Sequence, residues 1–241
     1  MSKIYEAVRK AAEERERTRE HVTSPSVSLL PDVPTPAAAA DEDYQRLRAS
    51  VVSVAVPSGL HTILVTAPRH GEGTTTVALG LALSLAKERD ARVLLVEANF
   101  RSPSLRTLLS LSADGGVLDF AAGRATPEAL TVRLEQLNLS VIAAGRPSEN
   151  APIEIVDALL ERVQSQFDFI LIDGPPVNSY ADASVLSTKA DGVILVIEAD
   201  QTPVSEAEMA KRQLDRVGAR ILGVVLNRRR SYIPAFLESV L

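Results

Sequence analysis

Residues 61–87 (HTILVTAPRHGEGTTTVALGLALSLAK) constrain the fold of this chain more than any other stretch. Residues 62–66 form a short β-branched run, which predicts a buried strand. Gly71 and Gly73 bracket a tight loop, and residues 74–87 are rich in alanine and leucine at helical spacing. A strand, a glycine loop and a helix in this order direct backbone N–H groups and a helix N-terminus at an anion. The stretch therefore predicts a phosphate-binding loop in an α/β protein.

This loop lacks the charge that such loops normally carry. A P-loop reads G-x-x-x-x-G-K-[ST], in which the lysine reaches the β- and γ-phosphates and the hydroxyl contacts Mg²⁺. Here Thr74 stands at the lysine position. The expected cofactor is ATP or ADP with Mg²⁺, with the binding weakened or lost. The expected nucleotide-binding residues are Arg69, Gly71, Glu72, Gly73, Thr74, Thr75, Thr76 and Asn227.

Composition narrows the functional classes. A chain of 241 residues that is 46% hydrophobic can bury the core of one α/β domain with an appendage. The sequence has no cysteine and three histidines, which argues against disulfides and a zinc site. A net charge of −5 with interspersed signs argues against a nucleic-acid binder. No apolar run approaches the roughly 20 residues of a membrane span, and the charged N-terminus is unlike a secretory signal. We expect a cytoplasmic protein.

The chain divides into three parts. Residues 1–21 have high helix propensity and a narrow apolar stripe, which suits either docking on a partner or a solvated helix that frays. Residues 22–40 carry four prolines and end in four alanines, as an extended linker does. Residues 41–241 form the main domain, and its first helix is expected over 41–56 with acidic residues at the N-terminus.

Apolar runs alternate with helical patterns through the rest of the domain. This alternation predicts a doubly wound, mostly parallel sheet. Residues 113–137 are expected to form helical excursions. Further helices are expected at 153–166 and 204–217, and further strands at 91–100, 139–145, 167–176, 191–200 and 220–227.

Four polar side chains follow the ends of these strands: Glu97, Asn99, Asp173 and Asn227. Ligands of open parallel sheets bind at the carboxyl ends of strands, so these residues are expected beside the loop. Asp173 ends an apolar run as a Walker B aspartate does, and with the Thr75 hydroxyl it is the candidate Mg²⁺ site. The alternative for Asp173 is a cap on the Gly-Pro-Pro turn that follows it.

Other candidates also have two interpretations. Asp182 lies near the γ-phosphate or caps the next helix. Arg69 reaches phosphate in place of the lysine, or points into solvent. Asn227 reads a purine edge or closes a strand-end turn. The candidate catalytic residues are Asp173, Glu97, Asn99 and Asp182.

Several segments together resemble the bacterial tyrosine kinases of capsule and exopolysaccharide export. These segments are MSKIYEAVRKA, EDYQRLR, the GEG loop, VLLVEANFRSPSL, FDFILIDGPPVNSYADASVLSTKADGVILVIEAD and GVVLNRRRSYIPAFL, which follow the family order along nearly the whole chain. The resemblance is to the detached cytoplasmic kinase domain that works with a membrane chain-length co-polymerase. It implies a P-loop NTPase-like fold with the topology of partition and division ATPases, plus a helical N-terminal extension.

The departures from that family are systematic. Thr74 replaces the family lysine, and Glu97 and Asn99 stand where its second Walker motif has two aspartates. The family motif for ring assembly reads E-x-x-R-x-x-R, whereas the helix over 42–48 has glutamine at its middle position. Relatives often end in a tyrosine-rich tail, whereas this C-terminus holds only Tyr232.

Three functions remain open from the sequence. The first is a degenerate, kinase-like regulator of polysaccharide synthesis. It would be bound to a membrane co-polymerase, and so placed at the inner membrane, and would oligomerise through the 42–48 helix. The second is an active tyrosine autokinase that uses Arg69 and Thr74 instead of lysine. The third is a partition- or division-type ATPase, in which Arg69 mimics an early loop lysine. The segment over 228–237 could also dock a partner, touch anionic lipid or form a solvated turn.

Overall fold

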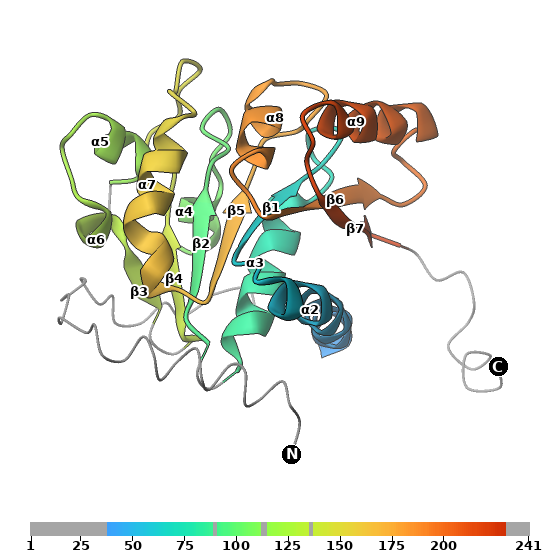
Figure 1. Ribbon diagram of the computed structural model, residues 1–241, viewed down its shortest axis with the longest axis horizontal. Coiled ribbons are helices and arrows are strands. Elements are labelled where there is room, and N and C mark those ends of the chain that lie inside the picture. Colours follow the sequence, from blue (N-terminus) through green and yellow to red (C-terminus); the bar gives the residue numbers. More distant parts are fainter. Residues whose placement is uncertain (1–37, 89–90, 112–114, 135–136, 230–241) are drawn as a thin grey trace.

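The computed structural model describes residues 38–229, except 89–90, 112–114 and 135–136 (Figure 1). The expected helix over 1–21 and Tyr232 lie outside this range. The strands are β1 (Thr62–Thr66), β2 (Val93–Glu97), β3 (Val132–Leu134), β4 (Leu139–Ile142), β5 (Phe169–Asp173), β6 (Gly192–Glu198) and β7 (Ile221–Asn227). The helices are α2 (Ala38–Ser58), α3 (Thr74–Ala86), α4 (Leu105–Leu108), α5 (Val117–Ala121), α6 (Pro127–Leu130), α7 (Ile155–Val163), α8 (Asp182–Ser187) and α9 (Val204–Arg216), with a 3₁₀ turn at Gln164–Gln166.

The strands form one sheet in the order β3-β4-β2-β5-β1-β6-β7. Every pair is parallel except β3 with β4. The expectation of a doubly wound, mostly parallel sheet is confirmed. The register sets Asp173 beside both Val65 of β1 and Glu97 of β2. The loop after β1 therefore lies next to the end of β5.

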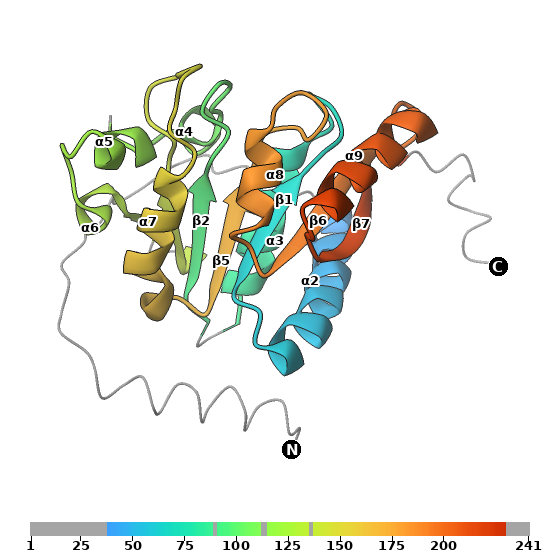
Figure 2. The ribbon, with the colours of Figure 1, turned by 45° about the horizontal axis from the view of Figure 1, so that its top comes forward.

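Helices cover both faces of the sheet, as Figures 1 and 2 show. Helices α2 and α3 pack on one face, and α7, α8 and α9 on the other. Strands β1 and β2 are buried along their whole length because both of their faces are covered. Their continuous apolar runs are typical of such parallel strands.

Helix α2 contacts α3 very closely at Gly80. A Cβ atom at Gly80 would lie 2.2 Å from the ring of Tyr44, so only glycine leaves room for that ring. The Tyr44 hydroxyl donates a 3.2 Å hydrogen bond to the carbonyl of Thr76, and Ser84 Oγ donates to the Tyr44 carbonyl at 3.2 Å. The first helix of the domain is thereby attached to the helix that follows the phosphate loop.

Three expectations about secondary structure were wrong. Helix α2 begins at Ala38, so the last three residues of the expected 22–40 linker are helical. Residues 113–137 include a strand, β3, as well as helices. In β3 two buried residues flank an exposed arginine, a period too short to recognise in the sequence. Helix α7 is shorter than the expected 153–166, because its last turn tightens into the 3₁₀ turn.

Candidate functional site

The loop between β1 and α3 has the geometry of a phosphate cradle. Gly71 and Gly73 have φ of 85° and 88°, the left-handed region that favours glycine. Gly73 caps α3, whose first turn begins at Thr74 and presents free N–H groups. Thr74 is half-buried, whereas Thr76 is exposed and its carbonyl is held by Tyr44. The sequence prediction of an anion-binding loop here agrees with this geometry.

Asp173 and Thr75 meet at the base of the loop. Thr75 Oγ1 donates a 2.7 Å hydrogen bond to Asp173 Oδ2. Asp173 is 1% exposed, and its Oδ1 has no hydrogen-bond partner among the described residues. Burial raises the pKa of Asp173 to about 8; the Thr75 hydrogen bond opposes this shift, and the Glu97 charge adds to it. An unpaired buried carboxylate oxygen beside a hydroxyl fits Mg²⁺, which prefers oxygen ligands.

The carboxylate of Glu97 accepts hydrogen bonds from backbone N–H groups. It is fully buried, and its Oε1 accepts hydrogen bonds from the N–H groups of Ser104 and of Leu105, the latter at 2.8 Å. Its Oε2 accepts from the Ala144 N–H at 3.0 Å. The carboxylate therefore joins the loop after β2 to the loop after β4. Asn99 Oδ1 accepts a hydrogen bond from the backbone N–H of Ser102, three residues later in the same loop, at 3.4 Å.

These contacts assign structural roles to Glu97 and Asn99. The catalytic roles expected for them stay predictions, and each would require breaking contacts that the structure makes. The distance that one extra methylene adds to glutamate over aspartate is what lets Glu97 contact both loops. Sequence reasoning missed this function because the three N–H groups come from residues 7 to 47 positions away.

Glu72, in the loop itself, is a second buried carboxylate. It is 1% exposed; its Oε2 accepts from the Arg69 N–H at 3.1 Å, and its Oε1 accepts from Thr202 Oγ1 at 2.5 Å. The Arg69 guanidinium lies 3.6 Å from Glu72 Oε1. Arg69 is therefore paired within its own loop, and a role in phosphate binding would require it to leave Glu72.

Residues at the end of β7 donate hydrogen bonds to backbone carbonyls of the phosphate loop. Asn227 Nδ2 donates a 2.8 Å hydrogen bond to the Glu72 carbonyl, and a Cβ atom at Gly73 would lie 2.2 Å from that nitrogen. Arg228 Nη1 donates to the Gly71 carbonyl at 2.9 Å and lies 3.1 Å from Glu198 Oε2. The amide of Asn227 is thus used by the loop, and purine recognition by it stays a prediction.

A cluster of side chains stands where the loops after β1, β2 and β5 meet. Asp182, at the start of α8, pairs with Arg101 from the loop after β2. The Arg101 guanidinium lies 4.2 Å from the centre of the Tyr180 ring, a cation–π contact. His70 Nε2 lies 3.2 Å from the Tyr180 hydroxyl. Sequence reasoning missed Arg101 and Tyr180. The signal available in the sequence was that both residues lie in loops that follow apolar strands, Arg101 after β2 and Tyr180 after β5.

Three described arginines near the cradle are paired with carboxylates of the chain itself. Arg69 faces Glu72, Arg101 faces Asp182, and Arg228 faces Glu198. In the part of the chain that the structure describes, none of these three cations replaces the missing lysine directly. The described site has a backbone cradle and a candidate Mg²⁺ pair, and each of these three arginines already has a carboxylate partner.

The residues of the 42–48 helix also find partners within the chain. Arg46 pairs with Glu42 at 2.7 Å, and Gln45 donates to Asp41 at 3.2 Å. Arg48 pairs with Glu88 on the loop after α3. The expected ring assembly through this helix stays a prediction. Among the described helices, none is both long and apolar enough to cross a membrane.

A glycine loop after the central strand, a helix that starts at its threonines and an aspartate on the adjacent strand define a P-loop NTPase-like protein. Residues 60–238 match the ParA family model, described as the NUBPL iron-transfer P-loop NTPase.

The relatives narrow this class further. Tyrosine-protein kinase CpsD of Streptococcus pneumoniae serotype 4 is 31% identical over 175 residues, which cover 70% of this chain and 76% of that protein. Tyrosine-protein kinase YwqD of Bacillus subtilis is 26% identical over 193 residues, covering 78% of this chain and 81% of that one. The kinase domain of Escherichia coli tyrosine kinase ETK has the same fold, with a TM-score of 0.77 at 23% identity over 90% of this chain and 86% of that chain. This chain belongs to the bacterial tyrosine kinase (BY-kinase) family of P-loop NTPases.

Proposed function

We propose that this chain is a degenerate, kinase-like regulatory protein of capsule or exopolysaccharide synthesis. It binds nucleotide weakly and transfers phosphoryl groups inefficiently. The observation that carries this proposal is the cradle itself: Thr74 stands at the lysine position, and Arg69, Arg101 and Arg228 are each paired with a carboxylate in the described structure. The names of its relatives, which are tyrosine-protein kinases, supply the kinase-like part of the proposal.

The expected loss can be estimated. A hydrogen bond to a charged group contributes about 1.5–3 kcal/mol, so removing the lysine weakens nucleotide binding about ten- to a hundredfold. Phosphoryl transfer depends on positioning and electrostatic stabilisation more than on covalent chemistry. The loss of a cation therefore lowers the rate of transfer more than it lowers the affinity for nucleotide.

The residues that would hold Mg²⁺ are Thr75 and Asp173. Mg²⁺ bound there would supply positive charge beside the phosphates of the nucleotide. Asp173 Oδ1 offers the unpaired oxygen, and Thr75 keeps Oδ2 oriented through its hydrogen bond. The protein's contribution is to bind and orient the phosphates with the loop N–H groups and α3.

The regulatory role requires a partner. We propose the membrane chain-length co-polymerase as that partner, with the chain held at the inner membrane through it. Assembly with further copies through the 42–48 helix is part of the same proposal. In that case the in-chain pairs of Arg46 and Arg48 would exchange for contacts between copies.

An active autokinase is the second candidate, and one observation favours it. The Thr75–Asp173 pair keeps the arrangement that a Mg²⁺ site requires, with a buried free oxygen. Such a kinase would recruit Arg69 from Glu72 when nucleotide binds.

Calorimetric titration with ATP and ADP, with and without Mg²⁺, separates these functions. The proposal expects weak or absent binding by the native chain and about ten- to a hundredfold tighter binding by Thr74→Lys. Gln201→Lys, which adds the same charge at an exposed position of the β6–α9 loop, should not restore binding. Micromolar binding by the native chain, together with autophosphorylation that Asp173→Ala abolishes, would overturn the proposal in favour of the active kinase.

A further inference from the structure

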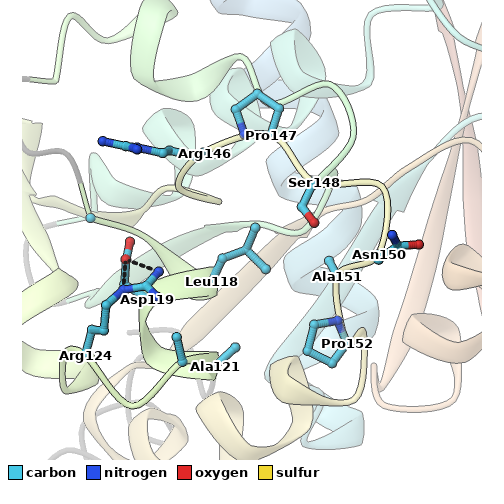
Figure 3. Close-up of a pocket in the computed structure, with 12 residues that line it drawn as sticks. Leu118, Asp119, Ala121, Arg124, Arg146, Pro147, Ser148, Asn150, Ala151 and Pro152 are labelled. Carbon is cyan, nitrogen blue, oxygen red and sulfur yellow. Dashed lines mark hydrogen bonds and ion pairs between the residues drawn. The ribbon is translucent and has the colours of Figure 1, made fainter.

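A pocket lies beyond the carboxyl end of β4 (Figure 3). Its volume is about 840 Å³, within the range of small-molecule sites. One wall comes from α5 and the turn after it, and the other from the loop over 145–152. The lining residues are Gly115, Leu118, Asp119, Ala121, Ala122, Arg124, Arg146, Pro147, Ser148, Asn150, Ala151 and Pro152.

The two walls are fixed to each other by backbone contacts. The Val117 N–H donates to the Ala143 carbonyl at 2.9 Å, and the Leu118 N–H donates to the Ala144 carbonyl at 3.1 Å. A Cβ atom at Gly116 would lie 2.1 Å from the backbone nitrogen of Gly145, so the two segments are in direct contact. The pocket is therefore preformed, which lowers the entropic cost of binding a ligand.

The lining divides into an apolar side and a polar rim. Leu118 extends its side chain toward the space between the walls in Figure 3, and Ala151 and Pro152 lie across from it. Ser148 and Asn150 add neutral polar groups at the opposite wall. An apolar body with a polar group at one end suits this distribution.

The charges of the lining leave one cation uncompensated. Arg124 Nη2 lies 2.7 Å from Asp119 Oδ1, and Asp119 Oδ2 accepts the Gly116 N–H at 3.0 Å. The Arg124 hydrogen bond, with help from Arg146, holds the pKa of Asp119 below its usual range, so Asp119 is ionised. Arg146 is exposed and makes no hydrogen bond or ion pair with the rest of the described chain. Two arginines and one aspartate leave one positive charge.

We propose that this pocket binds a small organic carboxylate. The Arg146 guanidinium matches a carboxylate with two parallel hydrogen bonds. The apolar body of the ligand would cover Leu118 and Pro152. A singly charged anion matches the single excess charge, whereas a more highly charged ligand would also repel Asp119.

Hydrogen bonds connect the segments beside the pocket to the phosphate site. Glu97 Oε2 holds the Ala144 N–H, and Glu97 Oε1 holds the Ser104 N–H. Ser104 Oγ in turn donates to Thr75 Oγ1 at 3.2 Å. The Ser148 N–H adds a second link, to the Phe100 carbonyl at 2.9 Å. A ligand that shifts the 145–152 loop should therefore be sensed at Ser104, beside the cradle.

Benzoate is the test probe, and benzamide is its neutral counterpart of the same shape. Each is titrated into the isotope-labelled full chain without nucleotide, and backbone amide shifts are followed. We expect benzoate to shift the amides of Gly115, Gly116 and Ala144 saturably, with a smaller shift at Ser104. Benzamide should bind at least tenfold more weakly, because it forms no charged pair with Arg146.

Three variants complete the experiment. Arg146→Ala should weaken benzoate at least tenfold, whereas Arg212→Ala, on the exposed side of α9, should leave its affinity unchanged. Asp119→Asn keeps a side-chain oxygen that can accept the Gly116 N–H, but it removes the negative charge that repels the ligand. The affinity for benzoate should therefore rise severalfold.

The proposal is overturned if benzoate does not saturate these amides, if benzamide binds as well, or if Arg146→Ala has no effect. Saturable shifts that never reach Ser104 would refute the link to the cradle. The outcome is independent of nucleotide binding, so it separates this proposal from the proposed function.

Discussion

Thr75 Oγ1 and Asp173 Oδ2 are joined by a 2.7 Å hydrogen bond between the first turn of α3 and the end of β5. This pair is intact although the neighbouring lysine position holds Thr74. The other oxygen of Asp173 is buried and unpaired in the described structure. The chain therefore presents the two oxygen-bearing side chains proposed to hold Mg²⁺, next to a threonine at the position of the P-loop lysine.

Asp173→Asn should stabilise the metal-free protein increasingly as pH rises from about 4 to about 8. The folded-state pKa of Asp173 is raised to about 8 from 3.8. Between these values the folded state holds a proton that the unfolded state has released. The native chain thus loses stability with rising pH, at up to about 1.4 kcal/mol per unit from this group. Below pH 4 both states are protonated, and above pH 8 both are ionised.

Urea unfolding of both proteins in EDTA, at intervals from pH 4 to 9, checks this slope. Asp191→Asn is the comparison, because Asp191 accepts two N–H groups at the opposite end of β1, each at 2.8 Å. That variant should be less stable than the native chain at neutral pH. A constant difference between Asp173→Asn and the native chain across the range would contradict the prediction.

Glu97→Asp should destabilise the fold although it restores a residue typical of the family. The shorter side chain cannot reach both Leu105 and Ala144, whose N–H groups lie 2.8 and 3.0 Å from the two oxygens of Glu97. Leaving a buried N–H unsatisfied costs about 1–3 kcal/mol. The free energy of unfolding measures the loss. Unchanged stability would contradict the prediction, because it would mean that the two loops move closer and still donate both hydrogen bonds to the shorter side chain.

Gly80→Ala should destabilise the packing of α2 on α3 by about 1–3 kcal/mol, because the new methyl group overlaps the Tyr44 ring. Tyr44→Ala should remove most of this penalty when both changes are combined, so a double-mutant cycle reports the contact. Gly223→Ala is the matched control, since nothing lies within 4 Å of its added Cβ. If the changes in unfolding free energy of Gly80→Ala and Tyr44→Ala simply add, the contact between Gly80 and the Tyr44 ring does not cause the destabilisation.

Asn227→Ala should loosen the phosphate loop more than it weakens the whole protein. It removes the 2.8 Å hydrogen bond to the Glu72 carbonyl, while Arg228 still holds Gly71. Amide hydrogen exchange at residues 71–74 should accelerate severalfold, with a loss of about 1 kcal/mol in global stability. Asn178→Ala, which removes contacts with Glu206 on α9, is the control and should leave exchange in the loop unchanged. Equal exchange in the two variants would show that Asn227 does not hold the loop.

The sequence alone predicted the parts that depend on local pattern. The 62–66 strand, the glycine loop and the helix after it follow from periodicity and from the backbone freedom of Gly71 and Gly73. The apolar run before Asp173 predicted that this carboxylate would end a strand. The strand β3 was missed because it has only three residues, too few to establish a period.

The tertiary structure decided which of the candidate polar residues are already paired within the chain and which are available to bind a ligand. Arg69 was a candidate phosphate ligand and Glu97 a candidate catalyst, yet one pairs with Glu72 and the other holds three N–H groups. Arg228 contacts Gly71 from 157 positions away. Hydrophobic periodicity is a local property that the sequence displays directly. The partner of a charged side chain depends on which loops the sheet brings together, and only the fold determines that.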